Sequence, residues 1–200
     1  QMTLEQKAGQ MTQITLDVIT VGEKRTKSDE PLQLDSALVL EAFGKYKVGS
    51  VLNTANNRAR TTHKWNSVIS YLQEVAIEET GIPVLYGIDA IHGATYTAGA
   101  TFFPQQIGQG ATFNPELVKK LNEITAYEMR ASGIPWNFSP VLDMGRDPRD
   151  PRMWETYGEA VLLAKRMGIA ATKGLQGDGE TIDINHGAAP DFLILTPKLK

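Results

Sequence analysis

The stretch that most constrains the fold of this chain runs from Val84 to Gly93 and reads V-L-Y-G-I-D-A-I-H-G. Its apolar run stops at Asp89, and a loop rich in Gly, Ala and Thr follows. This pattern predicts a buried strand that carries a carboxylate at its carboxyl end. Ligands of α/β folds gather at that edge of the sheet. Asp89 is therefore a candidate functional residue, although an Asp here can equally begin a loop or cap a helix.

Apolar periodicity predicts that strands and helices alternate along the whole chain. We expect helices over residues 4–11, 38–46, 62–79, 115–133 and 159–175, and strands over 48–52, 84–89 and 135–142. Repeated strand–helix units imply a parallel sheet, either doubly wound or closed as a (β/α)₈ barrel. Long loops after the strands favour the barrel, which typically needs about 250 residues. We therefore expect a partial TIM (β/α)₈ barrel, its first three to four βα units, and a chain that is a fragment.

Composition excludes several classes of function. The formal charge is −3 and the acids and bases are interspersed, which argues against nucleic-acid binding and against binding to an anionic membrane. The chain has no cysteine, so disulfides, thiolate catalysis and sulfur-ligated metals are excluded. No run approaches the roughly 20 apolar residues that span a bilayer.

Polar side chains collect where the predicted strands end. This set lacks a phosphate-binding glycine loop and a metal-ligand spacing, so we expect no cofactor and no metal. Carboxylates, guanidinium groups and an aromatic face suit a polyhydroxylated ligand. Arg146 and Arg149 have an alternative role, because a loop with two Asp-Pro pairs can be held together by internal salt bridges. The set comprises Asn53, Asp89, Asp143, Arg146, Arg152 and Glu155, with His92 and Trp154 nearby.

Several spaced segments resemble, in the right order, the N-terminal barrel domain of family 3 glycoside hydrolases of the β-glucosidase type. The resemblance extends from residue 1 to about 180, so we expect residues 1–180 to be the N-terminal part of that barrel domain. Residues 181–200 then form an atypical tail. The matching segments are Met2–Met11, Tyr86–Gly93, Phe103-Pro104, Ala111–Pro115, Ser139–Pro148 and Arg152–Glu159.

The resemblance implies roles for particular residues. The Asp of the family's G-x-D-A-x-H-G motif, here Asp89, binds hydroxyls of the innermost sugar. The second Arg of the R-D-P-R-W-G-R-x-x-E pattern, here Arg152, binds the same sugar and is followed by Glu155, with Arg146 as support. The sequence departs from the pattern at 150–151, where Asp-Pro replaces Trp-Gly. The nucleophilic Asp and the acid/base of the family lie further along its chains, so no catalytic residue is expected here.

The implied parent protein is a retaining, exo-acting β-glucosidase or β-xylosidase. Its partners would be an oligosaccharide or β-glucoside substrate and the missing C-terminal portion of the same protein, and relatives suggest a periplasmic or secreted location. The alternative is a non-catalytic carbohydrate-binding or structural barrel fragment. A doubly wound enzyme that binds phosphate at residues 93–110 is disfavoured, since G-x-G-x-x-G is missing there. The family's Lys-His pair is also missing after Ala188-Ala189, which suggests that residues 190–200 come from a truncation or frame disruption.

Overall fold

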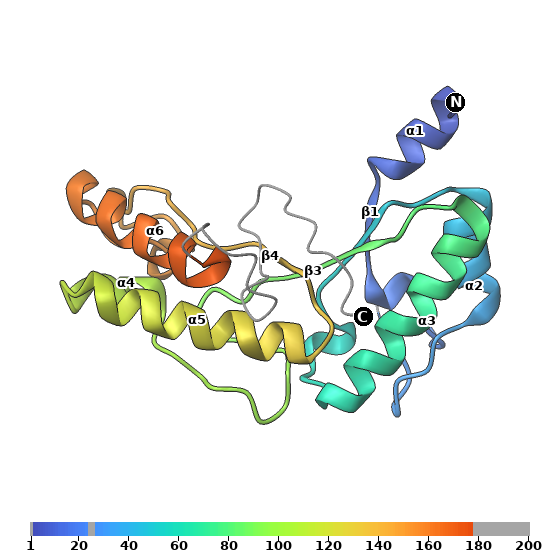
Figure 1. Cartoon of the computed structure of the whole chain (residues 1–200), viewed down its shortest axis with the longest axis horizontal. Helices are drawn as coiled ribbons and strands as arrows, with labels where there is room; N and C mark the ends of the chain where they lie inside the picture. Colours follow the sequence, from blue (N-terminus) through green and yellow to red (C-terminus); the bar gives the residue numbers. More distant parts are fainter. Residues whose placement is uncertain (1, 24–26, 178–200) are drawn as a thin grey trace. The chain divides into compact units, whose positions relative to one another are not determined.

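The computed structural model describes residues 2–23 and 27–177 and divides into two compact units, one ending at Ile88 and the other beginning at Asp89 (Figure 1). Each unit is described here by itself. The predicted atypical tail, residues 181–200, lies outside the described residues, and so does His186. Within the described ranges, no helix combines the length and the apolar character that a bilayer crossing requires.

Three short parallel strands form the sheet of the first unit. β1 (Gln13–Thr15) pairs with β2 (Ser50–Leu52), and β2 pairs with β3 (Leu85–Ile88). The register aligns Ile14 with Val51 and Val51 with Tyr86. β2 and β3 lie within the predicted ranges, whereas β1 was not predicted, because three residues between a helix and a polar segment give too short a pattern to recognise.

Helices flank these strands in the first unit. Thr3 and Gln6 form a capping box at the start of α1 (Leu4–Gln10), as the T-x-x-Q spacing in the sequence predicts. α2 (Ser36–Leu40) continues into the π-helical turn η2 (Glu41–Lys45), and α3 (Thr62–Thr80) is the longest helix of this unit. Trp65 of α3 is fully buried and packs edge-on against Tyr86 of β3, with ring centroids 5.6 Å apart. The apolar stripe of α3 therefore covers the sheet, as its sequence predicts.

Short turns follow two strands of the first unit. η1 (Leu16–Ile19) follows β1, and η3 (Ala55–Asn57) follows β2. The segment that carries Glu30 is held to the chain after η3, since Arg60 donates to both carboxylate oxygens of Glu30 at 2.7 Å. Arg60 also donates to the Ala55 carbonyl at 2.9 Å. A buried arginine thus fixes the loops that follow two neighbouring strands.

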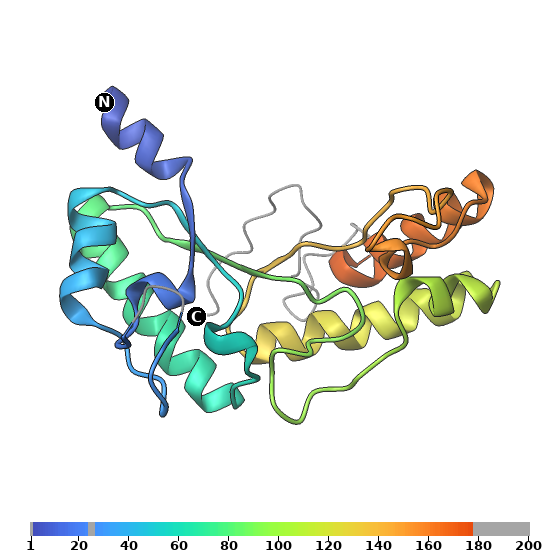
Figure 2. The same ribbon diagram turned by 180° about the vertical axis from the view of Figure 1, so that it is seen from behind.

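The second unit is built on α5 (Pro115–Ala131) and α6 (Val161–Gln176), which pack side by side (Figure 1, Figure 2). Asn114 caps α5 through its side chain, and Pro115 occupies the first turn, as the sequence predicts. α4 (Gln106–Ala111) precedes α5 and was not predicted. One apolar cluster of this unit joins α5, α6 and the segment before α6: Val118, Tyr157, Ala164, Met167, Ala170 and Ala171.

The prediction of a strand over residues 135–142 is wrong for most of that range. Only β4 (Trp136–Asn137) is a strand, and the chain continues in an irregular path to the 3₁₀ turn η4 (Met153–Glu155). At Val141 the Gln106 side chain takes the place of a strand partner, because it donates to the Val141 carbonyl at 2.8 Å and accepts from the Val141 N–H at 3.0 Å. Backbone groups that a neighbouring strand would satisfy are bonded to a side chain instead. Strands and helices nevertheless alternate along the described residues, except that α5 follows α4 directly, which confirms the α/β class.

Candidate functional site

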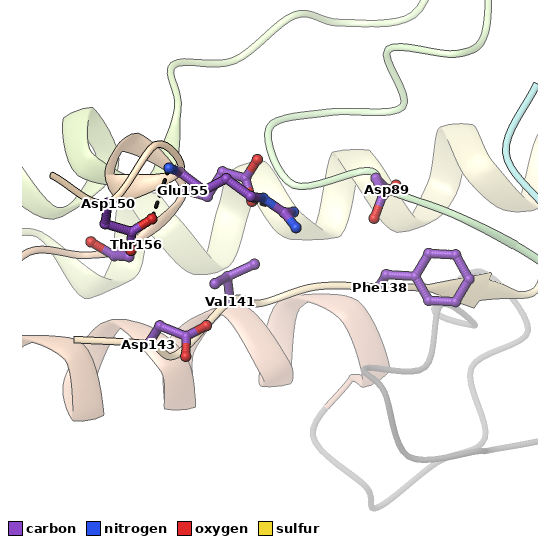
Figure 3. Close-up of a pocket in the computed structure, with 8 residues that line it drawn as sticks. Asp89, Phe138, Val141, Asp143, Asp150, Glu155 and Thr156 are labelled. Carbon is purple, nitrogen blue, oxygen red and sulfur yellow. Dashed lines mark hydrogen bonds and ion pairs between the residues drawn. The ribbon is translucent and has the colours of Figure 1, made fainter. Parts of the chain in front are cut away.

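A cavity of about 400 Å³ opens on the second unit, among segments that follow β3 and β4 along the chain. Figure 3 shows Asp89 and Phe138 at one end, and Asp150, Glu155 and Thr156 at the other, with Val141 and Asp143 along the segment between them. The volume lies within the range of small-molecule sites. The lining is mostly polar and comprises Asp89, Phe138, Val141, Asp143, Asp150, Arg152, Glu155 and Thr156.

Asp89 stands at the end of an apolar strand, where the sequence places it. The side chain is half-buried and lines the cavity. The next residue, Ala90, is fully buried, and the Asn137 side chain bonds both its N–H and its carbonyl. The chain beyond Asp89 is therefore held against β4, and the Asp89 carboxylate is left at the cavity.

Tyr96 shows how acidic the surroundings of Asp89 are. Burial raises the pKa of the Tyr96 phenol, and the charges of Asp89 and Glu155 raise it further. A negative charge disfavours a phenolate, so two carboxylates from distant parts of the sequence act on one hydroxyl. Asp89 and Glu155 therefore contribute to the same local electrostatic field.

Arg152 and Glu155 form the opposite side of the cavity. Arg152 donates from Nε at 2.9 Å and from Nη2 at 2.5 Å to Oε2 of Glu155. The Glu155 side chain is 14% exposed, whereas that of Arg152 is 65% exposed. The hydrogen bond to Glu155 is the main cause that raises the pKa of Arg152, and the charges of Asp89 and Asp143 add to it. A permanent cation thus lies among three carboxylates.

Local turns hold Arg152 in this position although the loop departs from the family's pattern at Asp150-Pro151. Oδ1 of Asp150 accepts from the backbone N–H of Arg152 at 2.9 Å, and the N–H of Glu155 donates to the Arg152 carbonyl at 3.0 Å.

After Thr156 the chain enters the apolar cluster through Tyr157, which is 2% exposed. A Cβ on Gly110 of α4 would lie only 2.7 Å from the Tyr157 carbonyl oxygen, so this close approach requires glycine.

Some of the polar residues collected from the sequence do not line this cavity. Arg146 is exposed and lies outside the lining, so the structure brings Asp89, Arg152 and Glu155 together but not Arg146. Arg149 pairs with Asp147 in the same loop, with Nη2 and Oδ2 2.6 Å apart. Arg149 therefore takes the alternative role that the sequence allowed, an internal salt bridge of the loop. Trp154 is 48% exposed and also lies outside the lining.

His92 and Asn53 have structural contacts of their own. Nδ1 of His92 lies 2.9 Å from the Phe103 carbonyl oxygen, and the Phe103 N–H donates to the His92 carbonyl at 2.8 Å. His92 therefore closes the base of the loop over residues 92–103. Asn53 belongs to the first unit, where its carbonyl accepts from the Tyr86 hydroxyl at 2.7 Å. Sequence reasoning overlooked Asn137, Phe138 and Thr156, since a single Asn, Phe or Thr carries no local signal.

The cavity offers acceptors and donors on facing sides. A carboxylate can accept from two adjacent hydroxyls, and a guanidinium can donate to oxygens of the same ligand. Phe138 adds an apolar face at the same end as Asp89 (Figure 3). Across residues 2–23 and 27–177 no group of three or more His, Asp or Glu side chains is arranged to hold a metal ion. This arrangement can bind a neutral ligand with several hydroxyl groups.

Comparison with protein-family models gives a match over residues 3–189. The matching model is described as the glycosyl hydrolase family 3 N terminal domain. It spans every residue that lines the cavity.

Curated relatives and solved structures agree with this match. A lysosomal beta glucosidase from Dictyostelium discoideum is 35% identical over 191 residues, which is 91% of this chain and 22% of that protein. A beta-xylosidase from Formosa agariphila is 42% identical over 117 residues, 56% of this chain and 16% of that protein. The crystal structure of an exo-1,3/1,4-beta-glucanase from a Pseudoalteromonas species superposes with a TM-score of 0.73 at 33% identity, and the match covers 90% of this chain and 21% of that one.

These similarities show the fold class of the chain and how much of a relative's length it spans. The similarity to the exo-glucanase, together with the parallel strands and alternating helices, confirms the predicted fold class, the first three to four units of a (β/α)₈ barrel. The chain spans about a fifth of the length of the lysosomal relative.

Proposed function

Because this chain belongs to glycosyl hydrolase family 3, as its N-terminal domain, we propose that it supplies one side of the innermost sugar subsite of a retaining, exo-acting β-glycosidase. The parent protein would hydrolyse terminal β-linked glucose or xylose, in keeping with the names of the relatives. Asp89 accepts hydrogen bonds from sugar hydroxyls in this proposal, Arg152 donates to the same sugar, and Glu155 orients Arg152. Arg146 supports the loop from outside the cavity.

One observation carries the proposal. Asp89 and Arg152 are more than sixty positions apart in sequence and line the same cavity of about 400 Å³. Glu155 shares a hydrogen-bonded pair with Arg152, and all three charged groups act on one another or on Tyr96. Hydrogen bonds to charged groups contribute more than neutral ones, so a sugar bound here would be held firmly at defined hydroxyls.

The chemical step requires groups beyond this cavity. A retaining glycosidase needs two carboxyl groups about 5–5.5 Å apart, one as nucleophile and one as acid/base. Our proposal assigns neither role to Asp89 or Asp143, and places both catalytic groups in later parts of the parent protein. Residues 1–180 are proposed as barrel domain and 181–200 as an atypical tail. Sequencing the gene past Lys200 and reading all three frames tests that division, since an out-of-frame Lys-His pair would mark a frame disruption.

The experiment compares the parent protein with the 200-residue chain. We expect the parent protein to release the aryl group from aryl β-glucosides or aryl β-xylosides and to yield the β-anomer first by proton NMR. The chain alone should give no turnover above the blank, because its cavity lacks the catalytic pair. Turnover by the chain alone would overturn our placement of the carboxylates.

A second measurement separates catalysis from simple binding. Isothermal titration of glucose into a parent protein that shows no hydrolysis would give a measurable Kd only if the alternative, a non-catalytic carbohydrate-binding barrel, is correct. Aryl α-glucosides serve as the matched substrate control, because an enzyme specific for β-linkages leaves them intact.

A further inference from the structure

Asn137 bonds the backbone of Ala90 beside the proposed sugar site. It is completely buried in β4, its Oδ1 accepts from the Ala90 N–H at 2.9 Å, and its Nδ2 donates to the Ala90 carbonyl at 3.2 Å. One side-chain amide therefore satisfies both backbone groups of one residue. Ala90 directly follows Asp89, so this contact fixes the backbone from which the Asp89 side chain projects.

Three further amides among the described residues make the same kind of contact, each with both backbone groups of one residue. They are Gln106 with Val141 at 2.8 and 3.0 Å, Gln73 with Val84 at 2.7 and 3.1 Å, and Asn56 with Ser28 at 2.8 and 3.1 Å. An amide offers a donor and an acceptor side by side and carries no charge, which suits the N–H and C=O of one residue.

We propose that Asn137 is the positioning residue for Asp89 and acts on the substrate only through it. The proposal rests on the sugar-binding role proposed above. Asp89 carries a charge at a half-buried position, and the loop after it is rich in Gly and Ala. Without the amide, the buried N–H and carbonyl of Ala90 both lose their hydrogen bonds. The backbone next to Asp89 is then no longer held to β4, and the Asp89 carboxylate loses its fixed position. Misplacement of a binding group by about 1 Å can lower a rate about 100-fold.

The test uses the parent protein and a double-mutant cycle. Asn137→Ala should lower kcat/KM for an activated aryl β-glycoside about 100-fold. In an Asp89→Ala background, Asn137→Ala should change kcat/KM by no more than about twofold, since the group that it positions is already absent. A purely structural role for Asn137 would produce the same loss in both backgrounds, and that result would overturn the proposal.

The matched control is Gln73→Ala. This variant removes the same kind of two-bond contact, but from Val84 in the first unit. We expect the Tm to fall while kcat/KM stays within about twofold of the parent value. Equal losses of kcat/KM in Gln73→Ala and Asn137→Ala would show that any lost amide contact lowers activity, and would contradict a special role for Asn137.

A conservative variant covers the case in which Asn137→Ala does not fold. Asn137→Asp keeps the acceptor for the Ala90 N–H but loses the donor to the Ala90 carbonyl. It should give a loss of kcat/KM that vanishes in the Asp89→Ala background, like that of Asn137→Ala. A loss that persists there would count against the proposal.

Hydrogen exchange separates this proposal from the proposed function. The amide of Ala90 should lose its protection in Asn137→Ala or Asn137→Asp, while the amide of Val141, which Gln106 holds, stays protected as an internal reference. Unchanged exchange at Ala90 would refute the positioning contact whatever the activity. Lost protection in a parent protein that hydrolyses no β-glycoside would refute the proposed function and leave the contact established.

Discussion

Arg60 of the first unit and Arg152 of the second each pair with a glutamate, yet their surroundings differ. The Arg60 side chain is 7% exposed, donates to both oxygens of Glu30, and also bonds the Ala55 carbonyl. The Arg152 side chain is 65% exposed and bonds Glu155 along one edge, through Nε and Nη2. The first guanidinium is buried and bonds protein acceptors through both Nη atoms, while its buried Nε has no hydrogen-bond partner; the second faces a cavity.

The two pairs also differ in the charged groups that surround them. The hydrogen bond from Arg60 lowers the pKa of Glu30 to about 2, against the opposing effect of burial. In the second pair the pKa of Arg152 is raised, and two further carboxylates, Asp89 and Asp143, contribute to the shift. A buried arginine bonded to protein acceptors stabilises the fold, whereas an exposed arginine among several acids can still donate to a ligand. The exposure of the arginine and the number of nearby carboxylates therefore distinguish the pair proposed to bind sugar from the structural pair.

The largest expected effect of this difference is on activity. Arg152→Met should lower kcat/KM of the parent protein about 1,000-fold, because two hydrogen bonds from a charged donor to the sugar would be lost. Arg149→Met is the matched control from the same loop, since the Arg149 side chain is 88% exposed and pairs only outside the cavity lining. Its kcat/KM should change by less than about threefold. Equal losses in the two variants would remove the distinction between the two arginines.

A smaller effect is expected on stability from the buried pair. Arg60→Met should lower the free energy of unfolding by about 2–3 kcal/mol, because it removes the strongest partner of Glu30 and the buried donor to the Ala55 carbonyl. The loss is smaller than for a fully buried pair, since Glu30 is 31% exposed and keeps Asn56 and Arg58 as neighbours. Urea unfolding of Arg60→Met and of Arg152→Met provides the comparison, and Arg152→Met should cost less than about 1 kcal/mol. A greater loss in Arg152→Met would reverse the assignment of the two pairs.

The smallest expected effect concerns acid pH. The pKa of Glu30 is about 2 in the folded chain, against an ordinary value of 4.5, so the unfolded chain binds more protons between these values. The stability that the Arg60 pair contributes is fully present above about pH 4.5 and is lost as the pH falls toward 2. Wild type should therefore lose stability more steeply than Glu30→Gln between about pH 5 and about pH 3, as measured by urea unfolding. Parallel curves would show that the pair contributes nothing.

Local signals in the sequence predicted much of the fold. The capping box at Thr3, the Asn114-Pro115 helix start and the apolar stripe of α3 each act within a few residues, so the pattern alone reveals them. The position of Asp89 at a strand end could be predicted in the same way, because an apolar run stops there. Its placement in one cavity with Arg152 could be expected only from the resemblance to a family.

Features that depend on partners distant in sequence could not be predicted. The strand expected over 135–142 stops at Asn137, and the backbone groups of Val141 bond the side chain of Gln106, 35 positions away, instead of a neighbouring strand. A single Gln in a helix gives no sign of such a partner. The loop presents three arginines of similar local sequence, and its charge pattern does not show that Arg152 enters the cavity while Arg146 remains outside.

If the cavity binds a sugar as proposed, its acidic lining predicts a selectivity among sugars. Four of the eight lining residues, Asp89, Asp143, Asp150 and Glu155, carry carboxylates, whereas Arg152 alone supplies a positive charge, a formal excess of three negative charges. A sugar that carries its own carboxylate or sulfate would be repelled, because like charges in a partly enclosed site are costly. Uronic acids and sulfated sugars should therefore be discriminated against by this wall before any contact with the hydroxyls is made.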